Sequence, residues 1–360
     1  MAPLYLGSTA ISKVYKGSTE LAQNYLGDNT MLVNAPTGTD HFGTIAYVGD
    51  RPTNSPKTGM GFAPDLVIIK GRSFDDHWSA LDTTQGAFLL SPNTTGFSEA
   101  FSGWSFGSDG FTVGSSGQAN SNGESHIAWG WKANGGTTSS NGNGTISSTV
   151  QANTTAGFSI VTYSGNNASS ATIGHGLDSA PQLVIVKAIN LSAGWPTMFN
   201  DGTYSHYGIR LNQSGVDTGN GGVFFNNTAP TNTVFTVGSA DEVNDGYNYV
   251  AYCWHSIPGY SKIAHYTGTG NTGLEISLGF QARFIAVKKV APSGDRWLVA
   301  DTTRHAAVNN DAFVDFTSTL DERDFNCTNG ITFGSNSFTI NTTDGSFNSS
   351  GATYIYFAFA

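Results

Sequence analysis

The chain is poor in charged residues and has no long apolar run. Asp, Glu, Lys and Arg make up only 12% of the 360 residues, and 26 acidic against 16 basic residues give a net charge of −10. The longest basic cluster is the pair Lys288 and Lys289. We expect no nucleic-acid binding, which needs a basic stripe to displace counterions. We expect no membrane insertion either, because no apolar run approaches the roughly 20 residues that a span requires.

Cysteine is also scarce. Cys253 and Cys327 lie at non-equivalent places in the repeat described below, so we expect free, buried thiols rather than a repeated disulfide. The first residues, MAPLYLGSTAISK, lack the basic start and apolar stretch of a secretory signal, and we expect synthesis in a cytoplasm. The 23 Phe, 14 Tyr and 7 Trp nevertheless supply enough apolar area for several small cores.

One pattern occurs three times along the chain. Each copy has an apolar strand that ends in lysine, then a tryptophan, an F-T-V or F-T-I strand and an aromatic closing strand. The lysine strands are PDLVIIK (residues 64–70), PQLVIVK (181–187) and ARFIAVK (282–288); the closing strands are HIAWGW (126–131), YVAYCW (249–254) and YIYFAF (354–359). Short strands with turn signals about every ten residues predict an all-β protein of three tandem β-sandwich or jelly-roll-like domains.

The repeat and the composition set the expected boundaries. Residues 1–34, with Tyr and Gly recurring about every ten residues, predict a short N-terminal β-meander that docks on another protein. The other expected segments are repeat 1 (35–133), a Gly/Ser/Asn-rich linker (134–156), repeat 2 (157–256) and repeat 3 (257–360).

Residues present in all three copies are expected to support each unit. We interpret Trp78, Trp195 and Trp297 as core anchors, and Asp82, Asp201 and Asp301 as turn or cap residues. Lys70, Lys187 and Lys288 stand at strand ends. We expect each lysine to pair with an acidic neighbour or to extend its ammonium out of the core.

No pattern in the sequence favours catalysis, a metal or a cofactor. GWSFG around Ser105 matches a nucleophile motif, but a turn and a strand follow where that chemistry needs a helix. The histidines lack metal-ligand spacing, and DEVNDG (residues 241–246) has Val243 where a calcium loop needs an oxygen ligand. We therefore do not expect an enzyme.

Recognition is better sought in residues that differ between the copies. Aromatic rings beside acidic, imidazole and guanidinium groups suit sugar binding, although the same mixture also serves subunit packing. The candidates are Asp75, Asp76, His77 and Trp104 in the first copy, and Tyr204, His206, Tyr207 and Arg210 in the second. The segment NNTAPTN (residues 226–232) is a further variable loop.

Longer phrases carry a resemblance to a known group of proteins. These are LYLGSTAISKVYKGSTEL, GFSIVTYSGN with GHGLDSAPQLVIVK, NYVAYCWHSIPGYSKIAHYTGTGN, and GSNSFTINTTDGSFNSSGATYIYFAFA. Together they resemble virion proteins of tailed phages, particularly marine ones, labelled tail fibre or tail protein and sharing an uncharacterised β-rich repeat. The resemblance is closest over residues 157–268 and at the C-terminus. The first copy departs from it, because MGFAPDLVIIK lacks the His-Gly-Leu of residues 175–177.

The resemblance implies a structural or adhesive part of a virion and brings no catalytic residues with it. The first hypothesis is a tail fibre or tail-associated adhesin that contacts a host surface glycan or protein, docks on other virion proteins through residues 1–34 and forms a homotrimer. The alternatives are a capsid decoration or head-fibre protein with no receptor, and a tailspike-like glycan depolymerase, which would need a carboxylate pair in a groove.

Overall fold

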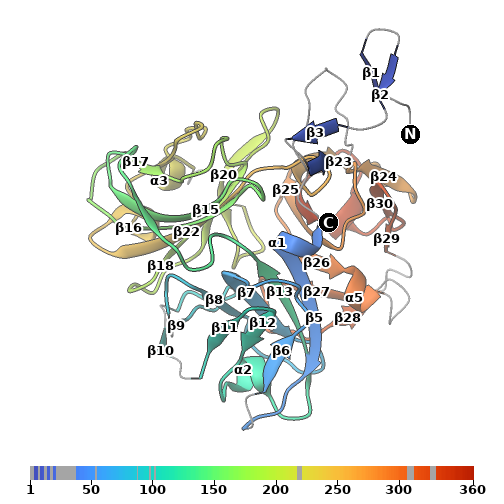
Figure 1. The fold of residues 1–360 in the computed structure, drawn as a ribbon, viewed down its shortest axis with the longest axis horizontal. Coiled ribbons are helices and arrows are strands. Elements are labelled where there is room, and N and C mark those ends of the chain that lie inside the picture. Colours follow the sequence, from blue (N-terminus) through green and yellow to red (C-terminus); the bar gives the residue numbers. More distant parts are fainter. Residues whose placement is uncertain are drawn as a thin grey trace.

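The computed structural model describes residues 4–6, 9–11, 14–16, 19–21, 38–52, 55–86, 88–96, 99–100, 103–216, 221–305, 312–324 and 330–360. The described chain is all-β, as expected, with antiparallel sheets and helices of one turn. Figure 1 shows three lobes, which we call the first unit (38–133), the second unit (134–256) and the third unit (257–360).

Each unit is built around one large sheet, and in all three an opening strand, a closing strand, the lysine strand and the tryptophan strand follow one another in that order. The first unit has β5 (Phe42–Val48), β13 (Ser125–Trp131), β7 (Leu66–Gly71) and β8 (Ser79–Asp82). The second has β16 (Phe158–Ser164), β22 (Asn248–Trp254), β18 (Leu183–Ala188) and β19 (Pro196–Asn200). The third has β23 (Ser261–Thr267), β31 (Thr353–Phe359), β25 (Phe284–Ala291) and β26 (Trp297–Asp301).

Further strands extend two of these sheets at their edges. The second unit adds β14 (Ser139–Asn141) and β15 (Ser148–Asn153) beside its opening strand, and β20 (Ser205–Arg210) at the other edge. The third adds β27 (Ala312–Asp315) and β28 (Arg323–Asp324). The expected linker, residues 134–156, therefore differs from the structure, because six residues of it pair with β16 from Ser148 opposite Tyr163 to Asn153 opposite Phe158.

Each unit also carries a smaller sheet on one face of the large one. These are β6 (Pro56–Thr58), β11 (Ser105–Gly107) and β12 (Gly110–Thr112) in the first unit; β17 (Ala171–Gly174) and β21 (Val234–Val237) in the second; and β24 (Leu274–Ser277), β29 (Ile331–Phe333) and β30 (Ser337–Ile340) in the third. A separate apolar cluster fills the space between the two sheets of each unit.

Short elements complete the described chain. The helices are α1 (Gly38–His41), α2 (Gly117–Asn120), α3 (Gly221–Phe225), α4 (Asp241–Asn244), α5 (Thr302–His305) and α6 (Gly345–Asn348). β9 (Phe88–Leu89) pairs with β10 (Glu99–Ala100). Near the N-terminus β1 (Leu4–Leu6) pairs with β2 (Thr9–Ile11), and β3 (Val14–Lys16) pairs with β4 (Thr19–Leu21). This region forms two separate hairpins rather than the continuous meander expected, and residues 22–37 lie outside the described residues.

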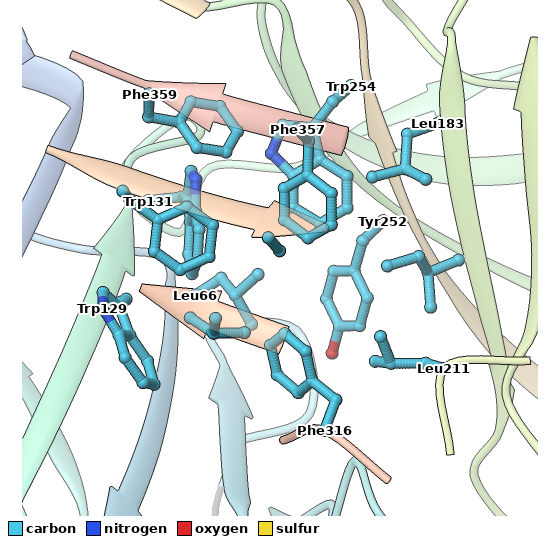
Figure 2. Packing of buried hydrophobic residues seen from close by; sticks show 14 of the residues in the cluster. Leu66, Trp129, Trp131, Leu183, Leu211, Tyr252, Trp254, Phe316, Phe357 and Phe359 are labelled. Carbon is cyan, nitrogen blue, oxygen red and sulfur yellow. The ribbon is translucent and has the colours of Figure 1, made fainter. Parts of the chain in front are cut away.

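The other faces of the three large sheets meet in one shared core. Because side chains alternate along a strand, Ile127, Trp129 and Trp131 of β13 enter this core, whereas Ala128 enters the first unit's own cluster. The same alternation holds in β22 and β31. Figure 2 shows aromatic side chains of all three units converging there. The Trp131 ring lies 6.1 Å from that of Trp254 and 5.7 Å from that of Phe359.

Candidate functional site

The contacts between units, which we call the seams, account for the residues that recur in all three copies. Each repeated tryptophan is buried and donates its indole N–H to a carbonyl of the neighbouring unit. The bonds run from Trp78 to Asp315 O (3.0 Å), from Trp195 to Thr94 O (3.1 Å) and from Trp297 to Arg210 O (3.3 Å). The first unit thus bonds to the third, the second unit to the first, and the third unit to the second. The three hydrogen bonds therefore form a closed ring of units.

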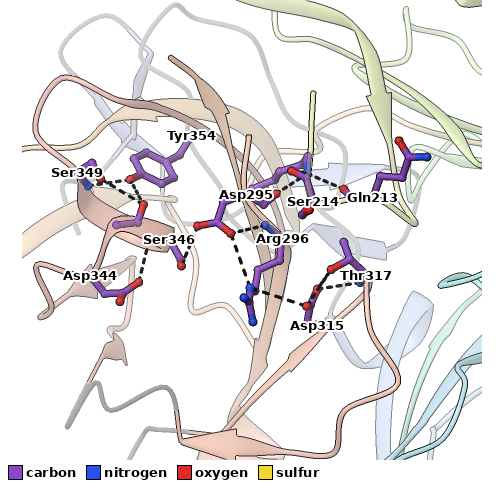
Figure 3. Close-up of polar contacts among 12 residues, drawn as sticks. Gln213, Ser214, Asp295, Arg296, Asp315, Thr317, Asp344, Ser346, Ser349 and Tyr354 are labelled. Carbon is purple, nitrogen blue, oxygen red and sulfur yellow. Dashed lines mark hydrogen bonds and ion pairs between the residues drawn. The ribbon is translucent and has the colours of Figure 1, made fainter. Parts of the chain in front are cut away.

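The repeated lysines lie at the same seams, beside the tryptophans. Their side chains are fully buried, and their ammonium groups donate to backbone carbonyls. The acceptors are Gly71 O and Thr319 O for Lys70; Thr95 O and Ala193 O for Lys187; and Gln213 O, Ser214 O and Asp295 O for Lys288. Figure 3 shows Gln213 and Ser214 of the second unit beside Asp295 of the third. The expectation of an acidic partner or an exposed ammonium is wrong, because the neighbouring unit covers each lysine.

Burial lowers the pKa of these lysines. The pKa of Lys70 and of Lys187 falls to about 8, and that of Lys288 to about 7, because the ammonium has lost its water. The ammonium of Lys187 lies 5.8 Å from the centre of the Trp195 ring, and that of Lys288 lies 5.7 Å from the centre of the Trp297 ring. The carbonyls and the ring faces partly replace the lost hydration.

The repeated aspartates join both sides of a seam. In each, Oδ1 accepts a backbone N–H of its own turn, from Thr84, Thr203 or Arg304. In each, Oδ2 accepts a hydrogen bond from the next unit: Tyr252 Oη to Asp82 (2.6 Å), His265 Nδ1 to Asp201 (2.6 Å) and Trp129 Nε1 to Asp301 (3.2 Å). The expected turn role is present, and the second oxygen adds a role in assembling the units.

The predicted recognition residues Asp75, Asp76 and His77 lie at the seam with the third unit. Asp321 N donates to Asp75 Oδ1 (2.8 Å), and Asp76 N donates to Thr319 O (2.9 Å). His77 Nδ1 lies 3.0 Å from the side-chain nitrogen of Asn93. This loop therefore packs against another part of the same chain.

Three of the second-unit candidates are half-buried on or beside β20. The ring of Tyr204 lies 5.2 Å from that of His265 in the third unit. Tyr207 Oη accepts a hydrogen bond from the Asn200 side chain (3.2 Å). His206 Nδ1 accepts one from Gly208 N (3.2 Å), and burial lowers its pKa. Their partly exposed rings remain predicted contact positions.

Arg210 and Trp104 have contacts within their own units. Arg210 binds Glu242 through both oxygens (Nη2 to Oε2, 2.7 Å; Nε to Oε1, 3.2 Å), and its guanidinium lies 4.6 Å from the centre of the Phe224 ring. Trp104 is half-buried, and its ring is stacked 6.3 Å from that of Phe111. The structure thus distributes the eight predicted residues over two seams and over contacts within the first and second units, instead of gathering them in one patch.

Polar loops at one end of the second unit are more exposed than the four candidates of that unit. They comprise residues 142–145, 166–170 and 226–233, and we call them the polar end. Asn226 Nδ2 donates to Ser170 Oγ (3.3 Å), which joins two of the loops, and Thr145 N donates to Thr172 Oγ1 (2.9 Å), which holds the third loop against β17. Amides and hydroxyls held in this way can bind a hydroxyl-rich ligand.

The exposed charges of the described residues are mainly negative, whereas the repeated lysines are buried at the seams. Among basic side chains whose burial the structure describes, Arg51 alone is exposed, because the others are buried or half-buried. The exposed carboxylates of the described chain are Asp40, Asp75, Asp109, Asp178, Asp241 and Glu275. An anionic and neutral exterior repels polyanions.

A family model described as "Domain of unknown function (DUF7483)" matches residues 37–360. The chain belongs to this family. The DUF7483 match includes all three units in one domain and begins after the N-terminal hairpins, so residues 1–36 lie outside it. Comparison with curated proteins and with solved structures found no match.

In the described part of the chain, no helix is long and apolar enough to cross a membrane. No group of three or more His, Cys, Asp or Glu side chains within the described ranges could hold a metal ion. Cys253 is a buried free thiol, and burial raises its pKa, whereas Cys327 lies outside the described residues.

Sequence reasoning missed the polar end, except for residues 226–232. The run NGGTTSSNGNGT indicated a linker, although its Asn and Gly residues form turns around β14. The signal that could have replaced the linker prediction with strand β15 is the polar and apolar alternation in STV (residues 148–150), where Thr149 is exposed between buried Ser148 and buried Val150.

Proposed function

We propose that this protein is a virion structural protein of a tailed phage, a tail fibre or tail-associated adhesin. The observation that carries the proposal is the division of the chain into an N-terminal segment outside the family domain and one closed body of three units. The N-terminal hairpins dock on other virion proteins, and the body presents the polar end to the host. The resemblance of the repeat phrases to phage tail proteins supports the same assignment.

The packing supports a role outside the cell. The repeated Trp, Lys and Asp residues join each unit to the next, and the shared core contains aromatic side chains from all three. Such interlocking raises the barrier to unfolding, which determines how long a protein lasts where nothing refolds it. The polar end provides amide and hydroxyl groups for a surface glycan.

Localisation in the particle tests the proposal. Cryo-EM of particles of the phage that encodes this chain, with gold-labelled antibodies against residues 37–360, should place the label on the tail or baseplate. Label spread over the capsid would replace the adhesin with a decoration protein. Particles without the chain would overturn the virion assignment altogether.

Binding by the purified chain tests the receptor function separately. We expect the full chain to bind host cells, and N226A/T228A in the polar end to reduce binding more than S346A, which lies in the third unit. Equal binding by both variants would exclude the polar end as the contact. Clearing of host polysaccharide by the purified chain would instead indicate a depolymerase.

A further inference from the structure

The closing strands of the second and third units each place a tyrosine hydroxyl against a short helix. Tyr249 Oη donates to Asp241 O (2.5 Å), at the start of α4, and accepts from Asp245 N (2.8 Å), just after it. Tyr354 Oη donates to Gly345 O (2.7 Å) and accepts from Ser349 N (2.7 Å) around α6, as Figure 3 shows. The hydroxyl thus joins two backbone groups that the helix itself leaves open.

The first unit has His126 at this position. His126, Tyr249 and Tyr354 are each the second residue of their closing strand. Each is stacked on a tyrosine of the opening strand, with ring centres 5.0 Å apart for Tyr47 and His126, 5.0 Å for Tyr163 and Tyr249, and 4.9 Å for Tyr266 and Tyr354. The helix beside His126 is α2, because Tyr47, whose ring is stacked on His126, donates its hydroxyl to Ala119 O in that helix (2.6 Å). The equivalent backbone groups are therefore Gly117 O and Ser121 N.

The imidazole has one nitrogen that the described protein atoms do not satisfy. His126 is fully buried, and Nδ1 lies 3.0 Å from Glu124 O, so Nδ1 carries the proton and donates it. Burial lowers the pKa of His126 to about 4, which keeps the ring neutral at pH 7. Nε2 is therefore an acceptor, and it has no hydrogen-bond partner among the described residues.

The neighbouring side chain fills volume without supplying a donor. Phe74 packs with its edge toward His126, at a ring distance of 5.2 Å, and occupies the position of Leu191 in the second unit, four residues after the lysine. Gly71 leaves room for it, because a Cβ there would come within 2.7 Å of the Phe74 ring. The larger phenyl ring compensates for the smaller imidazole, but it has no polar atom.

We propose that a single buried water molecule takes, in the first unit, the place that a tyrosine hydroxyl holds in the other two. It donates one hydrogen to His126 Nε2 and the other to Gly117 O, and it accepts the N–H of Ser121. Three hydrogen bonds are what a buried water typically makes (about 3). The first unit thus has a water site where the second and third units have a tyrosine hydroxyl oxygen.

A crystal structure of the full chain, at a resolution that defines ordered water, tests the site directly. We expect a density peak within hydrogen-bond range, about 2.7–3.2 Å, of His126 Nε2, Gly117 O and Ser121 N. Protein atoms in that position, or the absence of a peak there, would overturn the proposal.

A pair of variants tests it in solution. In F74L/H126Y the new hydroxyl should displace the water, and its melting midpoint should exceed that of F74L/H126F by about 2–4 °C, since only the former has an oxygen for Gly117 and Ser121. Tyr354→Phe, which removes the hydroxyl in the third unit, should lower the midpoint by a similar amount and serves as the matched control. Equal midpoints for the two double variants, with a drop for Tyr354→Phe, would contradict the proposal. If neither double variant folds, the crystal structure of the natural chain decides.

Discussion

The buried lysines at the seams are the residues through which pH acts most directly on this molecule. An ammonium group that donates to several carbonyls of two units is a strong link, but it must be desolvated to form. Lys288 combines the largest number of carbonyl acceptors with the lowest pKa of the three. Substitution of Lys288 should therefore change the pH dependence of stability more than substitution of Lys70 or Lys187.

We predict that alkaline pH stabilises the protein through these lysines. In the unfolded chain a lysine titrates near a pKa of about 10.4, whereas Lys288 titrates at about 7 when folded. Between these values the unfolded chain binds more protons, so the free energy of unfolding rises with pH. Thermal unfolding should show a midpoint that rises from pH 7 to 9.5.

The variant Lys288→Met is the control for this pH dependence. It keeps the apolar stem and has no titrating group, so it should melt lower at pH 7 but with a flatter rise. Parallel curves for the natural chain and Lys288→Met would show that the carbonyls keep the Lys288 ammonium charged. That outcome would contradict the prediction.

At the scale of single residues, the sequence indicated burial of the tryptophans and the turn role of the aspartates. It could not indicate the seam bonds, because most acceptors are backbone carbonyls such as Thr94 O and Thr319 O, which have no side-chain signature. The recognition residues were chosen because they differ between copies. At Asp75 and Asp76 that difference reflects packing on the third unit.

Among the structural elements, the seam between the first and third units differs from the other two. The chain itself joins the first unit to the second and the second to the third, but the seam that closes the ring has no such connection. It carries an ion pair of Arg72 with Glu322, in which Nε lies 2.6 Å from Oε2 and Nη2 lies 3.2 Å from Oε1. This ion pair links the first unit to the third at the seam that no chain connection crosses.

We predict that Glu322→Gln loosens this seam. Breaking one partner of a largely buried charged pair costs about 1–3 kcal/mol. Hydrogen exchange should accelerate in β5 and β27, on both sides of the seam. Glu242→Gln is the matched control, since Arg210 and Glu242 form a pair of similar geometry and burial within one unit. Equal acceleration at the seam in both variants would contradict the role of Arg72 and Glu322.

The strands that recur in the sequence were predicted well, because opening, lysine and closing strands are strongly apolar and carry clear turn signals. The additional strands β14 and β15 were not, since a stretch rich in Asn, Gly and Ser favours a linker. In the N-terminal region the alternating residues predicted strands correctly. Their division into two hairpins depends on pairing that the local pattern does not specify.

For the whole molecule, the shared core determines how the units unfold. Three tandem domains with separate cores would melt independently. Here each large sheet is covered on both faces, once by its own small sheet and once by the other units. The sequence contained an indication that the large sheets are covered on both faces. Closing strands such as YIYFAF are apolar on both faces, which is typical of strands buried on both sides.

We predict a single calorimetric transition for residues 38–360. Trp129→Ala, in the shared core, should lower the stability of all three units together by about 3–5 kcal/mol. Hydrogen exchange should then rise in β16 and β25 as well as in β13. Exchange that rises in the first unit alone, or separate transitions in calorimetry, would show that the units are independent domains.

The homotrimer stays a prediction, and the mass in solution tests it. Exposed sheet edges and a particle's threefold sites favour three copies. Light scattering of the full chain should give about three times the mass of one chain, 37.8 kDa. A monomeric mass would indicate that the three units of one chain already provide the threefold arrangement.

The position of the closing strands in the chain matters during synthesis. β13, β22 and β31 each lie between two other strands of their sheet, yet each is the last described strand of its unit to leave the ribosome. Before β31 emerges, Trp131 and Phe42 lack Phe359, against which both rings pack in the finished protein. A prematurely terminated chain therefore exposes aromatic surface, which marks it for aggregation or proteolysis. Each unit can therefore complete its part of the shared core only after its closing strand has been made.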